Sequence, residues 1–257
     1  LHRVDRRQRQ MCIRDRPNGE RNWGNLSTTA FTNAVNVIAT TGISYASSNG
    51  LSLPLVGSAN VSNTVLTATT YQISTSRSCC SDVFTYDLGE LVVYDGTSTT
   101  ATAQRLEGYL ADKWGVRGSL PSTHPFRNFP PATALFVPTQ VSGIALWLDA
   151  ADASTFTVSG GTLTSIQDKS GTGKTMTINS APTYSSNGFN NGPGFVYASG
   201  NRISTTTPTL GRTATLIAAY RVTANATSVP LALGLPNSGT ETGIGFNLPS
   251  AYYNIYD

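Results

Sequence analysis

Residues 86–127, YDLGELVVYDGTSTTATAQRLEGYLADKWGVRGSLPSTHPFR, decide the fold of this chain. They begin with a strand-like run, Leu88 to Tyr94, that is apolar on both faces, as in a central or helix-covered strand. A Thr/Ser turn follows, and then apolar residues recur at i, i+3, i+4 and i+8: Leu106, Tyr109, Leu110 and Trp114. That spacing gives a helix one apolar face. Thr99 or Thr100 can cap its start, and Gly115 stands at its end. The stretch predicts a buried strand and one short α-helix near residues 100–114 that covers it.

The rest of the composition favours strands. Charged residues make up only 12% of the chain, against about 25% in typical domains, and Thr, Ser, Gly and Asn fill the polar positions. Short apolar runs alternate with turn clusters, which is typical of a many-stranded sandwich. The predicted strands cover residues 34–39, 64–73, 88–94, 144–148, 163–166, 175–178, 195–197, 213–222, 242–248 and 252–256. We therefore predict an all-β fold, an antiparallel jelly-roll-type sandwich.

Two groups of motifs resemble a known superfamily. EGYLADKWG at 107–115 and LPSTHPF at 120–126 resemble the closing segment of concanavalin A-like lectin/glucanase (laminin G-like) modules. GIALWLDAADAS at 143–154 and DKSGTG at 168–173 resemble the opening segment of the same modules. The resemblance implies a β-sandwich, in a superfamily that includes both lectins and glucanases.

In this chain the motifs of a closing segment, at 107–126, precede the motifs of an opening segment, at 143–173. The chain is therefore expected to span the junction of two tandem modules: residues 17–116 end one sandwich, residues 117–139 form a Pro-rich linker, and residues 140–257 begin a second sandwich. The first and last strands of such sandwiches lie side by side. The two parts are therefore also expected to pair as one permuted sandwich, because separate halves would expose sheet edges.

The basic charge is concentrated in an N-terminal arm. Seven of the 17 Lys and Arg residues are arginines within the first 21 positions, and the remaining 236 residues carry 10 basic and 11 acidic side chains. A basic arm can neutralise phosphates, but residues 1–16 resemble translated adaptor sequence and are expected to be a non-native or disordered arm. Without the arm, nothing in the composition favours a nucleic-acid partner.

The candidate ligand-binding residues are three aspartates and two tyrosines. Asp149, Asp152 and Asp168 supply oxygen atoms that can bind sugar hydroxyls or Ca²⁺. Tyr252 and Tyr253 supply aromatic rings for a sugar to stack on. Alternatively, the aspartates cap turns and the tyrosines pack in the sandwich. No cofactor is required, and a metal site remains open. The expected partner is a glycan or a host or cell-surface glycoprotein.

Hydrolysis is a less favoured alternative. Glycosidases need two neighbouring carboxylates, but the glutamates Glu20, Glu90, Glu107 and Glu241 are each isolated in the sequence. Glu107 is expected to be solvated or salt-bridged. Trp114 and Trp147 are expected to be packing residues, and His124 to brace the turn from Pro121 to Pro125. We predict a non-catalytic module or, alternatively, a structural spacer.

Two further patterns have ordinary interpretations. SGTGKT at 170–175 ends like a phosphate-binding loop, but Asp168 stands where that motif needs its first glycine. A polar hairpin turn, with Gly171 or Gly173 at positive φ, is the favoured interpretation. A disulfide between the adjacent Cys79 and Cys80 would close no long loop.

Sparse cysteine and the lectin-like motifs favour an extracellular, cell-envelope or virion-surface location without direct membrane insertion.

Overall fold

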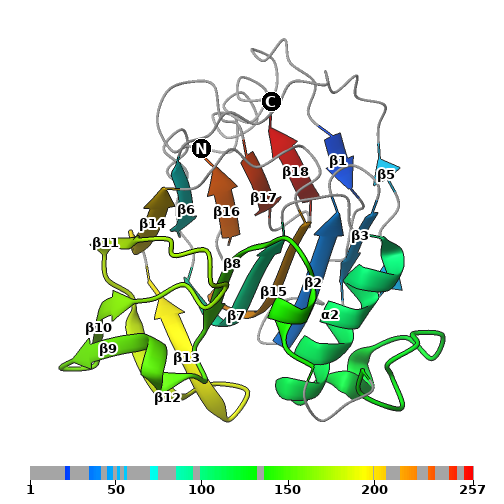
Figure 1. The fold of residues 1–257 in the computed structure, drawn as a ribbon, viewed down its shortest axis with the longest axis horizontal. Coiled ribbons are helices and arrows are strands. Elements are labelled where there is room, and N and C mark those ends of the chain that lie inside the picture. Colours follow the sequence, from blue (N-terminus) through cyan, green and yellow to red (C-terminus); the bar gives the residue numbers. More distant parts are fainter. Residues whose placement is uncertain are drawn as a thin grey trace, which may run out of the picture.

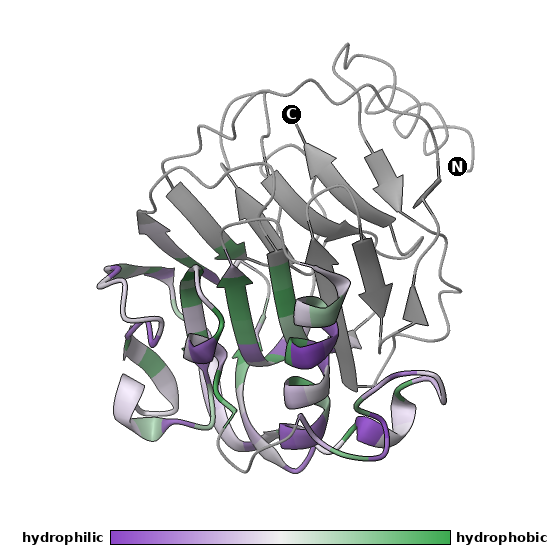
Figure 2. Cartoon of the chain, turned by 45° about the vertical axis from the view of Figure 1, so that its right-hand side comes forward, coloured by the Kyte–Doolittle hydropathy of each residue, from purple (hydrophilic) through white to green (hydrophobic). Residues whose placement is uncertain are grey.

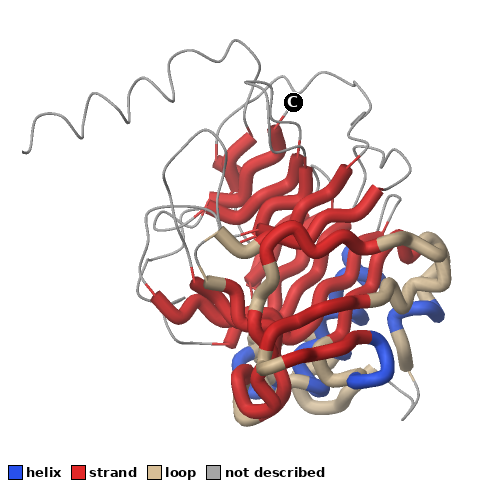
Figure 3. Tube along the Cα trace, turned by 90° about the vertical axis from the view of Figure 1, so that its left-hand side faces the viewer, coloured by secondary structure: helices blue, strands red, loops and turns tan. Residues whose placement is uncertain are grey.

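A computed structural model describes part of the chain. The described residues are 21–23, 35–41, 45–48, 51–52, 55–56, 70–74, 85–94, 99–131, 136–198, 200–206, 215–224, 231–234, 243–247 and 252–256. Within these ranges antiparallel strands dominate, accompanied by one α-helix, α2 (Thr100–Lys113), and short 3-10 turns (Figures 1 and 3). The predicted all-β class is confirmed. In this part of the chain, no helix has the length and apolar character needed to cross a membrane.

The larger sheet forms one layer of the sandwich. Its strands are β2 (Val35–Thr41), β3 (Tyr45–Ser48), β4 (Leu51–Ser52), β7 (Thr85–Tyr94), β8 (Ile144–Asp149), β9 (Phe156–Ser159), β10 (Thr162–Ile166), β12 (Thr183–Phe189), β13 (Gly192–Tyr197) and β15 (Thr215–Ala224). Their order is β4-β3-β2-β15-β7-β13-β12-β10-β9, and β8 also pairs with β7.

Two smaller sheets form the opposite layer. One has the order β16-β17-β18-β1-β5 and the other β11-β14-β6. Their strands are β1 (Arg21–Trp23), β5 (Leu55–Val56), β6 (Thr70–Ser74), β11 (Met176–Ser180), β14 (Arg202–Thr206), β16 (Leu231–Gly234), β17 (Gly243–Asn247) and β18 (Tyr252–Tyr256). Figure 1 shows β14, β6, β16, β17, β18, β1 and β5 in a row across the upper part of the molecule.

Strand β7 is the centre of the larger sheet. Its residues 86–93 are all buried, as expected for a strand that is apolar on both faces. β15 pairs along one edge, whereas β13 and β8 share the other: Leu88 faces Phe195, and Leu91 faces Leu148. All three partners come from beyond residue 139. The strand pairing across residues 117–139 that a permuted sandwich requires is therefore present.

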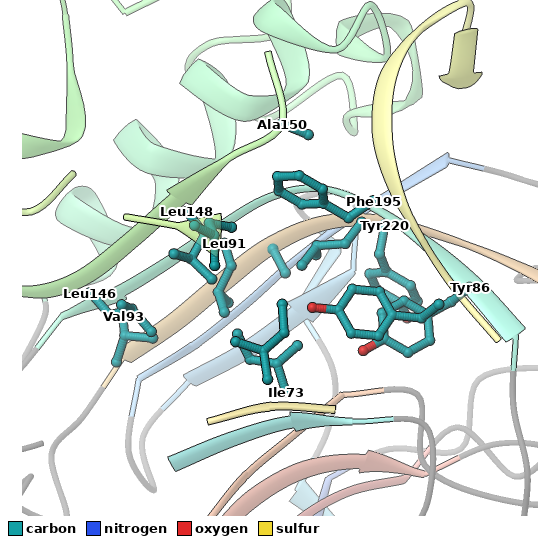
Figure 4. Packing of buried hydrophobic residues seen from close by; sticks show 14 of the residues in the cluster. Ile73, Tyr86, Leu91, Val93, Leu146, Leu148, Ala150, Phe195 and Tyr220 are labelled. Atoms are coloured by element: carbon teal, nitrogen blue, oxygen red, sulfur yellow. The ribbon is translucent and has the colours of Figure 1, made fainter. Parts of the chain in front are cut away.

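The main core lies between the two layers. Figure 4 shows Ile73 of β6 across from Leu91 and Val93 of β7. The stacked rings of Tyr86 and Tyr197, with centroids 4.6 Å apart, extend this core. All five side chains are at most 2% exposed. Burying each of the aliphatic ones, Ile73, Leu91 and Val93, contributes about 1.5–3 kcal/mol before entropic costs.

Helix α2 covers the outer face of the larger sheet. The Thr99 side chain caps it by accepting a 3.2 Å hydrogen bond from the Thr102 amide, and Gly115 ends it with φ +71°. Leu106 and Leu110, fully buried, pack with Ile217 and Ala219 of β15. In Figure 2 the central strands behind the helix are hydrophobic green, while the helix carries purple, hydrophilic turns. The predicted helix and its buried face are confirmed.

The segment after α2 differs from an extended Pro-rich linker. Its described parts, residues 117–131 and 136–139, include 3-10 turns at Arg117–Ser119 and Pro138–Gln140. Leu120 is 1% exposed and Phe136 is 6% exposed, and both pack against α2. The apolar side chains fold this segment back onto the helix, because extending it would leave them in water.

The turn between residues 166 and 176 is not a hairpin. Gly171 and Gly173 do adopt positive φ, at +83° and +69°. However, β10 pairs with β9 and β12, whereas β11 pairs with β14 in the other layer. The turn therefore carries the chain from one layer to the other.

Candidate functional site

A partly buried cluster of charges joins the end of α2 to the central strands. Glu90 of β7 and Asp149 of β8 are register partners on neighbouring strands. Lys113 Nζ, from the last turn of α2, lies 2.8 Å from Glu90 Oε2 and 2.8 Å from Asp149 Oδ1. Lys169 Nζ lies 2.7 Å from Asp149 Oδ2 and 2.8 Å from Asp152 Oδ2. We call these five residues, Glu90, Lys113, Asp149, Asp152 and Lys169, the ion network.

Glu90 is the most enclosed member of the ion network. Its side chain is 0% exposed. Trp147 Nε1 donates to Oε1 at 2.7 Å, and Trp114 Nε1 donates to Oε2 at 3.1 Å. The Tyr109 hydroxyl donates to Oε1 at 3.0 Å. Burial raises the pKa of Glu90, while the Lys113 ammonium opposes that shift. A buried carboxylate with this many donors keeps its charge compensated.

Asp149 and Asp152 shape the chain after β8 as well as binding lysine. Asp149 Oδ1 accepts a 3.0 Å bond from the Ala151 amide. Asp152 Oδ1 accepts from the Ser154 amide and hydroxyl, at 3.2 and 2.6 Å. Hydrogen bonds from Lys169 and Ser154 lower the pKa of Asp152 to about 2. The turn-capping alternative for these two aspartates is therefore present in the structure.

Asp168 organises the turn between the layers. Its Oδ1 accepts from the Trp147 amide and the Ser170 amide, both at 2.9 Å. Its Oδ2 accepts from the hydroxyls of Ser170 and Thr172, at 2.6 and 2.8 Å. Both oxygens therefore bind donors from the protein itself. The hydrogen bond from the Ser170 amide shows that Asp168 caps this turn, the alternative role given above for the aspartates.

The three aspartates do not converge on an open cation position. Lysine ammonium groups contact Asp149 and Asp152, and hydroxyls and amides contact Asp168. Within the described ranges, no three His, Cys, Asp or Glu side chains gather in a way that could hold a metal ion. The geometry at Asp149, Asp152 and Asp168 thus differs from the oxygen cage that Ca²⁺ requires.

The other candidate residues have different outcomes. The backbones of Tyr252 and Tyr253 lie in β18, but their side chains are outside the described residues, as are residues 1–16 and Cys79 and Cys80. Trp114 and Trp147 do pack in the core, 5% and 6% exposed. Both also donate to Glu90, a role that the packing interpretation missed.

Two further buried charges have their own partners. The Glu107 and His124 side chains, both 0% exposed, lie 3.3 Å apart at Oε2 and Nε2, so Glu107 is paired rather than solvated. His124 Nδ1 also accepts from the Phe126 amide at 3.2 Å, which braces the turn as predicted. Asp87 is bound by Arg221, and burial raises its pKa while Arg221 opposes the shift.

The glutamates are thus less isolated than the sequence indicated. Glu90 and Asp149 each lie 2.8 Å from the same ammonium nitrogen, so the fold brings two carboxyl groups close together, as glycoside hydrolysis requires. The sequence alone offered one signal of this site: Glu90 is a charged residue inside an apolar strand, and a buried charge must have a partner.

No protein-family model matches the chain, and neither a curated protein nor a solved structure is significantly similar to it.

Proposed function

We propose that this chain belongs to a non-catalytic, lectin-like β-sandwich that binds glycans or a host or cell-surface glycoprotein. In this proposal it is part of a larger extracellular, cell-envelope or virion-surface protein. The two-layer antiparallel sandwich supports this, with its helix directly after the central strand. Most of the motif EGYLADKWG lies in that helix, and the motif GIALWLDAADAS begins with strand β8, which supports the proposal.

The observation that carries the non-catalytic part is the enclosure of the carboxylate pair. Glu90 and Asp149 are 0% and 4% exposed. Lys113, the two tryptophans and Tyr109 bind Glu90 from within the protein. A glycosidase must bring both carboxyl groups against a sugar ring. This enclosure favours binding over hydrolysis.

A glycan array screened with the full chain tests the proposal. Tyr252 and Tyr253 are consecutive in β18, and successive residues of a strand project to opposite faces. We therefore expect one glycan class to bind and only one of Tyr252→Ala and Tyr253→Ala to weaken it. Loss of an aromatic platform should weaken binding by about two- to tenfold, since aromatic contacts contribute about 0.5–1.5 kcal/mol beyond their area and 1.4 kcal/mol is tenfold. The other variant serves as the matched control.

A structural spacer is the second candidate. The observation that favours it is the engagement of Asp149, Asp152 and Asp168 with donors of the same chain. If no glycan on the array binds and neither tyrosine variant changes any signal, the spacer replaces the binding proposal.

A further inference from the structure

The ion network holds the reactants of a condensation in contact. A primary amine, Lys113 Nζ, lies 2.8 Å from an oxygen of the Asp149 carboxyl group and 2.8 Å from the Glu90 carboxyl group. Aromatic rings line the amine: its nitrogen lies 5.6 Å from the Tyr109 ring centroid and 5.5 Å from that of Trp114. Lys113 is 24% exposed, whereas its two carboxyl partners are almost fully buried.

We propose that Lys113 and Asp149 condense into an intramolecular amide, an isopeptide bond, with Glu90 as the acid and base of the reaction. This covalent modification goes beyond glycan binding and does not depend on it. It joins the end of α2 to β8, across the segment 117–139 that separates the two groups of motifs.

The step balances without an external reagent. Glu90 takes one proton from the Lys113 ammonium, and the resulting amine attacks Cγ of Asp149 while the C=O electron pair moves to Oδ2. The proton on Glu90 and a second proton from the attacking nitrogen then move to Oδ1. The Oδ2 electron pair re-forms the C=O bond, the Cγ–Oδ1 bond breaks and one water molecule leaves. The third proton stays on the amide nitrogen.

Lys169 assists the same step from the other side of Asp149. Its ammonium lies 2.7 Å from Oδ2, the oxygen on which negative charge develops, and a fixed cation there stabilises the tetrahedral intermediate. Lys169 is also shared with Asp152 and stacks over the Trp147 ring at 4.1 Å. Lys113 contacts Glu90 directly, so it is assigned as the nucleophile.

Burial favours the reaction in two ways. Contact between fixed groups replaces an encounter in solution, and well-oriented groups reach effective concentrations of roughly 10⁵–10⁸ M. Desolvation makes a neutral amide more favourable than an enclosed ion pair. Desolvation also raises the pKa of Glu90, which is faced by Lys113, Tyr109 and Trp114 from α2 and by Trp147 and Asp149 from β8, so that it can hold the proton in transit.

The intact mass of the purified full chain, measured after denaturation, tests this. We expect it to be lower than the sequence mass by one water, about 18 Da. Trypsin should then release residues 106–117 joined to residues 128–169, because an acylated Lys113 is not cleaved. A mass equal to the sequence mass overturns the proposal. So does a loss of water mapped to any other pair, including Lys169 with Asp149.

Three variants separate the reaction from a plain ion pair. Lys113→Arg keeps the charge but lacks the nucleophilic amine, and Glu90→Gln keeps the shape but lacks the proton carrier, so both should show their full sequence mass. Asp112→Ala removes an exposed carboxyl group on the same helix, paired with Arg117 at 2.8 Å, and should retain the loss of water. The wild-type measurement decides the proposal even if a variant fails to fold, and a loss of water retained in Lys113→Arg also contradicts it.

Discussion

At the scale of single residues, Lys169 controls the ionisation of Asp152. Its hydrogen bond is the largest cause of the lowered pKa of Asp152, about 2, against the usual 3.8. An acid whose pKa is lower in the folded state stabilises the fold above its unfolded pKa, and this contribution is lost as the pH falls through the folded pKa. The contribution should therefore be complete above about pH 4 and disappear toward pH 2.

Replacing Lys169 tests this assignment. Lys169→Met should raise the pKa of Asp152 toward its ordinary value, although the two hydrogen bonds from Ser154 keep part of the shift. Lys174→Met is the matched control, since Lys174 Nζ contacts Thr172 Oγ1 at 3.1 Å in the same turn. Carboxyl-carbon NMR titrations of Asp152 would measure both. An unchanged pKa in Lys169→Met would show that Ser154 alone produces the shift.

Single residues also mark what the sequence could and could not reveal. Gly115 was recognisable as the end of α2, and Thr99 as one of two possible caps at its start, because capping depends on local chemistry. Glu90 was visible as a charge within an apolar run, but its partner Trp147 lies 57 residues away. Finding that contact requires the register between β7 and β8, which no local pattern encodes.

At the scale of elements, the strands that could be predicted from the sequence are those with long apolar runs. The runs at 88–94, 144–148 and 213–222 correspond to the buried strands β7, β8 and β15, whose apolar residues leave little choice of structure. β12, TYSSNGF, has no such run, and most of its residues are exposed or half-buried. Its strand structure comes from pairing with β13 and β10, so tertiary context and not local preference creates it.

The packing of α2 leads to a prediction that opposes helix propensity. Alanine is favoured over glycine inside a helix by about 1 kcal/mol. At Gly108, however, an added Cβ would lie 2.5 Å from Phe126 Cβ, far inside contact distance. Overpacking costs about 1–3 kcal/mol, so Gly108→Ala should lower the free energy of unfolding by up to about 2 kcal/mol.

Gly118→Ala provides the control for this element. An added Cβ at Gly118 would have no heavy atom within 4 Å, and the residue occupies a surface turn. The free energy of unfolding of Gly118→Ala should differ from that of the wild type by no more than about 0.5 kcal/mol. Urea titrations of both variants decide the matter. If Gly108→Ala were as stable as the wild type, the turn around Phe126 would have to move away from the helix at little cost, which would contradict the prediction.

At the scale of the whole molecule, the two sides of residues 117–139 depend on each other. β7 comes from the first side, and its partners β8, β13 and β15 come from the second. Separating them would expose both edges of β7 and the apolar faces of all four strands. Exposed edges and faces of this kind drive aggregation. Neither side is therefore expected to fold without the other.

Splitting the chain between residues 133 and 134 tests this dependence. Residues 1–133 and 134–257, co-expressed with a tag on only one part, should co-purify in equal amounts, whereas each part expressed alone should be insoluble. A first part that is soluble and helical on its own would contradict the shared sheet and favour two independent modules.

A denaturing gel of the co-purified pair also tests the bond between Lys113 and Asp149. The parts should migrate as one band, because Lys113 and Asp149 lie on opposite sides of the cut, and Lys113→Arg should separate them into two bands without preventing co-purification.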